Sequence, residues 1–304
     1  MRVKKCLCLL VVVVVVTLVN PVGAGSDYHL NHNLSLMYAN TAFTFNNALQ
    51  FGLSYGLGGN GSRDFSSSDL TGGPKDVYLD YQQREANHRD QFNGNYEADA
   101  MRTTLGINTQ NDRLLWHSSI YYDDVEGQGN YTNFDTQTTG ITIMPGYQVL
   151  TQADSGVTVN VFVSLDINYR EFSQNFLSNQ WRINPGIAAS ASRQTDYGLF
   201  QAAYTYNYDR NIDGDTEVSG KAKIAGQAVG VNYARDITEN VYAMVGLTYM
   251  TTDDAPAGMT DEMTDVSVGV GTKPAKQWRV NGRYVDTISG GDGNSFNINI
   301  GYLW

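Results

Sequence analysis

Cysteine is almost absent from this sequence. The only two, Cys6 and Cys8, lie in an apolar run that follows three basic residues and precedes the small residues Gly23 and Ala24. That order is typical of a secretory signal peptide over residues 1–24, which we expect to be cleaved. Cleavage would leave a chain without cysteine, which excludes disulfides and thiolate metal sites and argues against a lipid-modified cysteine.

Long apolar runs are missing after residue 24, so the sequence predicts no membrane-spanning helix of about 20 residues. Charged residues make up only 17% of the chain, and the formal net charge is −11. Loss of Arg2, Lys4 and Lys5 with the signal peptide would lower this charge to −14. Since a nucleic-acid partner would call for a basic patch, this balance argues against one.

What the sequence does contain is a regular alternation of apolar and polar residues. In the clearest segment, Val157 to Arg170, the odd positions carry Val, Leu, Ile or Tyr, and the even positions are polar apart from Phe162. Successive side chains of a β-strand point to opposite faces. Each such segment therefore predicts a strand with one apolar and one polar face.

Twelve alternating segments follow one another from residue 75 onward. They span residues 75–84, 95–109, 113–123, 136–150, 156–171, 180–192, 197–209, 221–235, 240–252, 262–273, 276–287 and 294–304. Short turns such as 109–112 alternate with long polar loops such as 124–135, an arrangement typical of outer-membrane barrels. The sequence therefore predicts an all-β fold, a closed antiparallel transmembrane barrel of about twelve strands in a bacterial outer membrane.

Aromatic residues near the segment ends are expected to face outward as interfacial girdles. They include Tyr121, Tyr122 and Trp278. Two prolines, Pro145 and Pro185, fall inside segments. Because proline cannot donate to the strand ladder and a closed barrel has no free edge, we expect β-bulges at both.

Residues 25–74 allow two interpretations. Leu49, Phe51, Leu53, Tyr55 and Leu57 alternate as cleanly as any later strand, and pairing them with a strand near 34–44 would give a barrel of fourteen strands. That count would place an unusually long loop, residues 58–73, on the short-turn rim. We therefore prefer twelve strands over residues 75–304, with residues 25–74 as an N-terminal segment partly inside or below the barrel.

The C-terminal residues carry a more specific signal. Phe296, Ile298, Ile300, Tyr302 and Trp304 alternate with Asn297, Asn299, Gly301 and Leu303. This pattern resembles the C-terminal signature by which the barrel-assembly machinery recognises outer-membrane precursors, so that machinery is an expected partner.

The strand count, this final strand, and units such as Thr103–Asn108 followed by Leu114–Trp116 resemble autotransporter β-domains over residues 75–304. In that family the barrel follows a large secreted passenger, and a helix threads the pore. Here about fifty residues separate the signal peptide from the first predicted strand, and no passenger repeat is visible. The resemblance is therefore to solitary autotransporter-type barrels that lack a passenger.

Charged residues of both signs fall on the polar sides of the predicted strands. They are Asp76, Asp80, Arg102, His117, Asp166, Arg170, Arg182, Arg279 and Arg283. A charge facing lipid at the bilayer midplane would cost about 2–4 kcal/mol, so we expect these groups to face the lumen. They would either set the selectivity of a small pore or form a cross-lumen ion-pair network that plugs the barrel.

The sequence His117-Ser118-Ser119 resembles the His-x-Ser pair of outer-membrane phospholipases, with Asn130 in the following loop. In those enzymes the pair faces lipid. Here the opposite face carries Leu114, Trp116, Ile120 and Tyr122, so His117 and Ser119 are expected to point into the lumen. We therefore expect no enzyme, and a hydrolase using His117 and Ser119 stays the alternative.

The longer loops are acidic. The start of a calcium loop is matched by Asp209, Asn211, Asp213 and Asp215. Gly220, however, stands at the position where such a loop has a bidentate Glu. We therefore expect no metal site and no cofactor. Other acidic residues assigned to long loops are Asp123, Asp124, Glu126, Asp253, Asp254, Asp261 and Glu262. They predict a negative outer rim, which divalent cations would bridge to lipopolysaccharide. The same loops would serve a surface adhesin.

Overall fold

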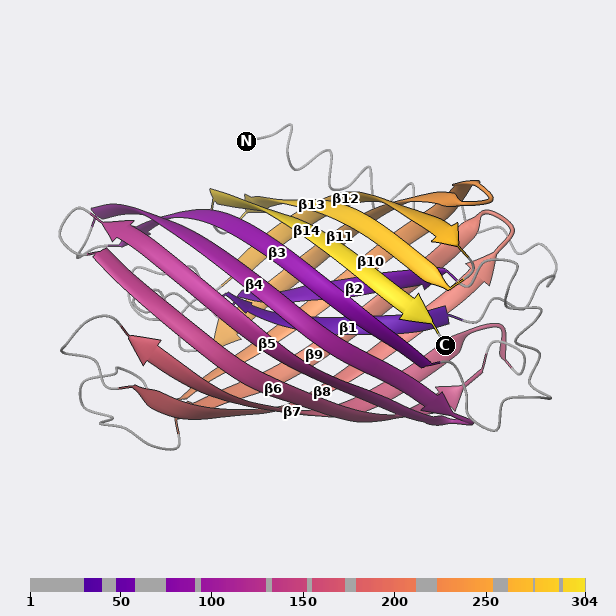
Figure 1. Ribbon diagram of the computed structural model, residues 1–304, viewed down its shortest axis with the longest axis horizontal. Coiled ribbons are helices and arrows are strands. Elements are labelled where there is room, and N and C mark those ends of the chain that lie inside the picture. Colours follow the sequence, from indigo (N-terminus) through magenta and orange to yellow (C-terminus); the bar gives the residue numbers. More distant parts are fainter. Residues whose placement is uncertain are drawn as a thin grey trace.

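The computed structural model of the protein describes residues 30–39, 48–57, 75–90, 94–129, 133–151, 155–172, 179–211, 223–253, 262–275, 277–289 and 292–303. These residues form fourteen strands (Figure 1). The first two are β1 (Leu30–Ala39) and β2 (Ala48–Leu57). The others are β3 (Lys75–Asp90), β4 (Gly94–Asn111), β5 (Leu114–Gly129), β6 (Asn133–Leu150), β7 (Thr158–Phe172), β8 (Gln180–Thr195), β9 (Gly198–Asn211), β10 (Lys223–Thr238), β11 (Val241–Asp253), β12 (Glu262–Ala275), β13 (Trp278–Ser289) and β14 (Asp292–Leu303).

Strands β3 to β14 form one closed barrel, and each pairs antiparallel with its neighbours in the chain. The ring closes where β14 pairs with β3, from Asp292 opposite Asn87 to Leu303 opposite Asp76. Twelve strands in a closed antiparallel barrel are what the alternating segments predict, so that prediction is confirmed. None of the described residues belongs to a helix long and apolar enough to cross a membrane.

The strands extend further than the sequence pattern indicated. β3 continues to Asp90 and β5 to Gly129, through residues predicted to be loop. Asp123, Asp124 and Glu126 consequently lie in β5, and their assignment to an acidic outer loop is wrong. Backbone pairing with β4 and β6 extends this strand past the end of its apolar alternation.

The predicted bulges at the two prolines are also wrong. Between β6 and β7, Ile143 pairs with Leu165 and Gly146 with Phe162, so the register is unchanged across Pro145. The register between β8 and β9 is likewise the same on both sides of Pro185. The register shift in β6 lies further on, between Gln148 and Leu150. Both proline side chains lie on the exposed face of the barrel wall.

Strands β1 and β2 form a separate two-stranded antiparallel sheet that is not part of the ring. They pair from Leu30 opposite Leu57 to Ala39 opposite Ala48. The predicted signal peptide, residues 1–24, lies outside the described residues, so its cleavage stays a prediction.

Aromatic pairs bridge neighbouring strands on the outer face near both rims. Trp278 of β13 lies opposite Tyr302 of β14, with ring centroids 5.0 Å apart. Near the other rim, Tyr169 of β7 and Trp181 of β8 are a second such pair at 5.1 Å. Cross-strand aromatic pairs stabilise a sheet and place amphipathic rings where membrane interfaces require them.

Candidate functional site in the barrel lumen

Burial alternates along the strands as the sequence predicts. In β7, Val163 is 61% exposed, whereas Ser164 is 3% exposed on the opposite face. Large apolar side chains such as Leu114, Ile120 and Val270 are likewise exposed on the outside. The outer surface is therefore apolar, and the polar and charged side chains line the lumen.

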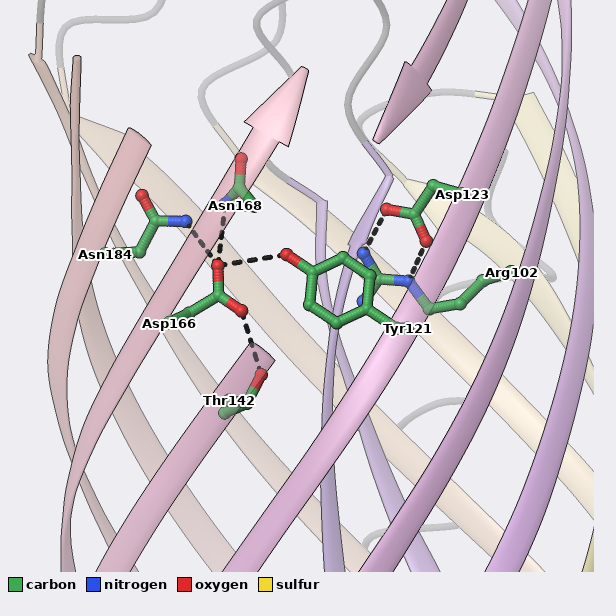
Figure 2. Close-up of polar contacts among 7 residues, drawn as sticks. All are labelled: Arg102, Tyr121, Asp123, Thr142, Asp166, Asn168 and Asn184. Carbon is green, nitrogen blue, oxygen red and sulfur yellow. Dashed lines mark hydrogen bonds and ion pairs between the residues drawn. The ribbon is translucent and has the colours of Figure 1, made fainter. Parts of the chain in front are cut away.

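Asp166 is the centre of a polar cluster inside the barrel (Figure 2). Its Oδ2 accepts a hydrogen bond of 2.8 Å from Thr142 in β6. Its Oδ1 accepts three, from Tyr121 in β5 (3.0 Å), Asn168 in β7 (2.7 Å) and Asn184 in β8 (2.9 Å). One carboxylate therefore connects four consecutive strands, and its donors compensate for the loss of water around it.

An ion pair lies beside this carboxylate. Arg102 of β4 and Asp123 of β5 are direct cross-strand neighbours, and the guanidinium donates to both carboxylate oxygens. The same guanidinium lies 4.3 Å from the centroid of the Tyr121 ring, and the hydroxyl of Tyr121 reaches Asp166. We call these seven residues the lumen network: Arg102, Tyr121, Asp123, Thr142, Asp166, Asn168 and Asn184.

A glycine allows Tyr121 to reach across the wall. Gly140 of β6 lies directly opposite Tyr121, and a Cβ on this glycine would lie 2.3 Å from the tyrosine ring. The ring therefore lies flat over the glycine, with its hydroxyl directed at Asp166. The same pairing recurs in the lumen for Tyr78 over Gly106, Phe162 over Gly146 and Tyr242 over Gly271.

Polar contacts continue around the rest of the ring. Asp80 accepts hydrogen bonds from Asn297 at 2.8 Å and from Asn299 at 3.1 Å, which joins β3 to β14. Arg283 of β13 donates to Asn232 at 2.8 Å and to Ser267 at 2.5 Å. These contacts hold buried polar groups against the wall on the side opposite β7 and β8.

An apolar band crosses part of the lumen wall. Six buried residues from β6 to β11 form a cluster that we call the apolar belt: Met144, Phe162, Ala188, Ala203, Ala228 and Met250. Phe162 lies directly opposite Ala188, and Ala228 directly opposite Met250. Gly226 and Gly230 flank Ala228 on the inner face of β10, so this part of the belt has no long polar side chain beside it on that strand.

The predicted lumen charges lie on the inner face wherever their side chains are described. Asp80, Arg102, His117, Asp166, Arg170, Arg182, Arg279 and Arg283 are all buried. The side chain of Asp76 is outside the described part. Of this set, the structure brings Arg102 and Asp166 together through Tyr121, while Asp80 and Arg283 lie in separate contacts. The Arg102–Asp123 pair joins neighbouring strands and does not cross the lumen.

Several lumen residues are absent from the predicted set. The sequence predicts Asp123 in a loop and Tyr121 in an outer girdle. Both side chains are instead buried in the lumen. Arg84 and Asp265 are buried there too. Positions 117, 119, 121 and 123 have the same parity, so the alternation that places His117 inward also places Tyr121 and Asp123 inward. That signal was present in the sequence.

His117 and Ser119 also lie on the lumen face, both buried. Nδ1 of His117 donates to the side-chain oxygen of Asn108 at 2.6 Å, and its Nε2 lies 3.5 Å from the hydroxyl of Tyr78. Asn130, the expected third member, lies outside the described residues. An imidazole held in this way is on the side of the wall away from lipid.

The remaining predicted features are described only in part. Phe296 and Ile298 in the final strand are exposed on the outer face, 46% and 37% respectively, whereas Trp304 lies outside the described residues. Asp209 and Asn211 belong to the end of β9, and Asp213 and Asp215 lie outside the described residues. Within the described part, no cluster of three or more histidines and acidic residues could hold a metal ion.

No protein-family model and no curated protein matches the sequence. Solved structures do match the fold. The translocator domain of the autotransporter NalP from Neisseria meningitidis is 12% identical, with a TM-score of 0.52 over 80% of this chain and 92% of that one. The transport unit of the autotransporter AIDA-I from Escherichia coli is 8% identical, with a TM-score of 0.53 over 78% and 92%.

An outer-membrane channel from Pseudomonas putida F1 is 11% identical, with a TM-score of 0.52 over 79% of this chain and 98% of that one. At these identities the likeness concerns the fold. The chain has the fold of an outer-membrane β-barrel, similar to autotransporter translocator domains and to channels, and the predicted resemblance is confirmed at that level.

Proposed function

We propose that this chain is a non-enzymatic integral protein of a bacterial outer membrane, exported with a cleaved signal peptide, whose narrow lumen is restricted by its own side chains. The observation that carries this proposal is the lumen network. Seven residues from five consecutive strands converge on one ion pair and one carboxylate, and they occupy space that a wide channel would leave to water.

The number of strands supports a narrow lumen. About eight strands enclose an interior that side chains just fill, whereas sixteen to eighteen leave an aqueous channel. The barrel here has twelve. A long Arg102 side chain and the Tyr121 ring, both buried, reduce the remaining width further.

The apolar outer face supports outer-membrane lipid and lipopolysaccharide as the surroundings of this barrel. The exposed Phe296 and Ile298 of β14 support delivery by the barrel-assembly machinery. The lipid environment is supported by the apolar side chains on the outside of the barrel. The assembly machinery is supported by a final strand of the type that it recognises.

Reconstitution of residues 25–304 into lipid vesicles tests the proposal. We expect β-rich circular dichroism, a band that shifts on heating in SDS gels, and a unit conductance far below that of a sixteen-strand porin. A mature chain that stays soluble without detergent, a helical spectrum, or a porin-sized conductance would each overturn it.

A lipid-release assay separates this barrel from the hydrolase alternative. We expect the wild type and His117→Ala to release fatty acid at the same background rate, because His117 is buried in the lumen and bonded to Asn108. Release by the wild type that disappears in His117→Ala and in Ser119→Ala would establish a hydrolase instead.

A further inference from the structure

The β1–β2 pair approaches opposite sides of the ring. Strand β2 has Cα atoms within 8 Å of β10 and β11, and β1 has Cα atoms within 8 Å of β4. In the closed order, β4 is six strands from β10 in either direction, so the two walls are diametrically opposed. A two-stranded sheet can approach both walls only from inside the barrel, where Figure 1 draws β1 and β2 behind β3 and β4.

The dimensions indicate how the sheet lies. Twelve strands about 4.8 Å apart and tilted by about 40° enclose a ring roughly 24 Å across. The two strands of the hairpin lie about 4.8 Å apart. Since β1 lies within 8 Å of one wall and β2 within 8 Å of the opposite wall, the pair spans most of that width. The pair therefore stands edgewise across the lumen and divides it into two halves. One half is lined by β5 to β9, and the other by β12, β13, β14 and β3.

The register gives the two faces of this sheet different chemistry. Residues opposite one another in an antiparallel pair share a face, and successive residues alternate between faces. One face carries the pairs Leu30–Leu57, His32–Tyr55, Leu34–Leu53, Leu36–Phe51 and Tyr38–Leu49. The other carries Asn31–Gly56, Asn33–Ser54, Ser35–Gly52, Met37–Gln50 and Ala39–Ala48. The first face is apolar apart from His32, and the second carries small or polar residues apart from Met37.

Both halves of the lumen carry buried charged groups, and they differ in their apolar side chains. The β5–β9 half contains Met144, Phe162, Ala188 and Ala203 of the apolar belt, together with charged residues such as Asp166 and Arg170. The other half is lined by polar side chains, all buried: Asp80, Gln82, Arg279, Asn281, Arg283 and Asn299. An apolar sheet face is stabilised by contact with apolar side chains such as those of the belt.

We infer that the β1–β2 hairpin is a resident septum of the barrel, which stands between β4 and the β10–β11 side of the wall. This inference rests on the proposed membrane barrel. It places β2 beside the two strands that carry Ala228 and Met250 of the apolar belt. It also means that the septum, in addition to the lumen network, closes the passage to solutes.

Deletion of residues 25–57 tests the closure. We expect the truncated barrel, once reconstituted and shown to be heat-modifiable, to conduct roughly tenfold more than the full mature chain, because the septum occupies the middle of the ring. If the truncated barrel and the full chain had the same low conductance, the septum would be overturned. The proposed barrel, with a lumen restricted by the lumen network, would not be affected. Porin-sized conductance in the full chain would overturn both.

Substitutions on the two faces supply a matched comparison that does not depend on the deletion variant folding. Leu34→Asn, Leu36→Asn and Leu53→Asn together should raise conductance toward that of the deletion, because they replace apolar area whose burial stabilises the hairpin inside the barrel. Asn33→Ala, Ser35→Ala and Ser54→Ala together lie on the opposite face and should leave it unchanged. The same response from both sets would overturn the apolar face as the one that holds the septum in the lumen.

A single-cysteine reporter distinguishes a septum from two additional wall strands. The mature chain has no cysteine, so a bimane fluorophore attached at Leu53→Cys reports one site. In vesicles of brominated lipid, bromine quenches a fluorophore that contacts the lipid chains. We expect no quenching of bimane at Leu53→Cys, as for bimane at Ser164→Cys in the lumen. Val163→Cys on the lipid face should be quenched. Quenching at Leu53→Cys would place the hairpin in the wall and overturn the septum.

Discussion

Two arcs of the barrel wall obey the same alternation rule but fill the lumen in different ways. From β4 to β8 the inner face carries the lumen network, with Asp166 bonded to four strands. From β9 to β11 it carries mainly small or apolar residues such as Ala203, Ala228 and Met250. The first arc closes on itself through hydrogen bonds. The second leaves space that another part of the chain can occupy.

These two ways of filling the lumen have different energetic consequences. A buried charge must be compensated by a partner or by several donors, and removal of one partner leaves the other unsatisfied. A wall region lined mainly by small and apolar residues carries no such obligation, so a small change there has little effect. The network arc should therefore be sensitive to single substitutions, and the β9–β11 arc more tolerant of them around Ala203, Ala228 and Gly230.

The largest effect is expected from Arg102→Met. This change leaves Asp123 buried without its cation and removes the contact with Tyr121, so the free energy of unfolding should fall by about 3–5 kcal/mol. Urea titration of the reconstituted barrel, followed by tryptophan fluorescence, measures the difference. The double variant Arg102→Met with Asp123→Leu removes both charges and should recover most of the loss. Equal losses in the single and double variants would mean that the pair is not a coupled unit.

A smaller loss is expected for Asp166→Asn. The substitution keeps the volume of the side chain but replaces one acceptor oxygen by an amide nitrogen. Because this nitrogen is itself a donor, it cannot accept from the donors around Asp166, and the unfolding free energy should fall by about 1.5–3 kcal/mol. Thr142→Val removes a single donor to the same carboxylate and is the reference. In a double-mutant cycle the two changes should not be additive, because they share one hydrogen bond. Additive losses would contradict the central role of Asp166.

The features that depend on period alone could be predicted from the sequence. Alternation around Val163 and Asp166 identified the strand, its two faces and the twelve-strand ring, because a β-strand has a fixed period of two. The inward positions of Arg102 and Arg283 followed from the same parity. Of the lumen network, the predicted set of lumen charges contains only Arg102 and Asp166. Tyr121 and Asp123 resemble an interfacial aromatic and a loop acid in composition, whereas their parity places both inward.

Other features require the register, which one sequence does not contain. Asp166 meets Thr142 and Asn184 because each lies directly opposite it on a neighbouring strand. A change of one residue in either pairing would turn these partners outward. Pro145 could not be assessed in advance for a related reason: whether a missing donor forces a bulge depends on the neighbouring strands, and here the register continues unchanged.

The glycines under the lumen aromatics give the most direct comparison of the two arcs. A Cβ at Gly140 would lie 2.3 Å from the Tyr121 ring, whereas the nearest atom to a Cβ at Gly230 of β10 is Oγ1 of Thr248 at 3.5 Å, an ordinary contact. Gly140→Ala must displace the ring from Asp166 and should cost about 1–3 kcal/mol of unfolding free energy. Gly230→Ala should change it by less than about 0.5 kcal/mol. Both are glycine-to-alanine changes on inward positions of strands, so backbone entropy and β-propensity cancel between them. If both variants unfolded at the same urea concentration, the two arcs would not differ in packing, and the contrast between them would reduce to charge alone.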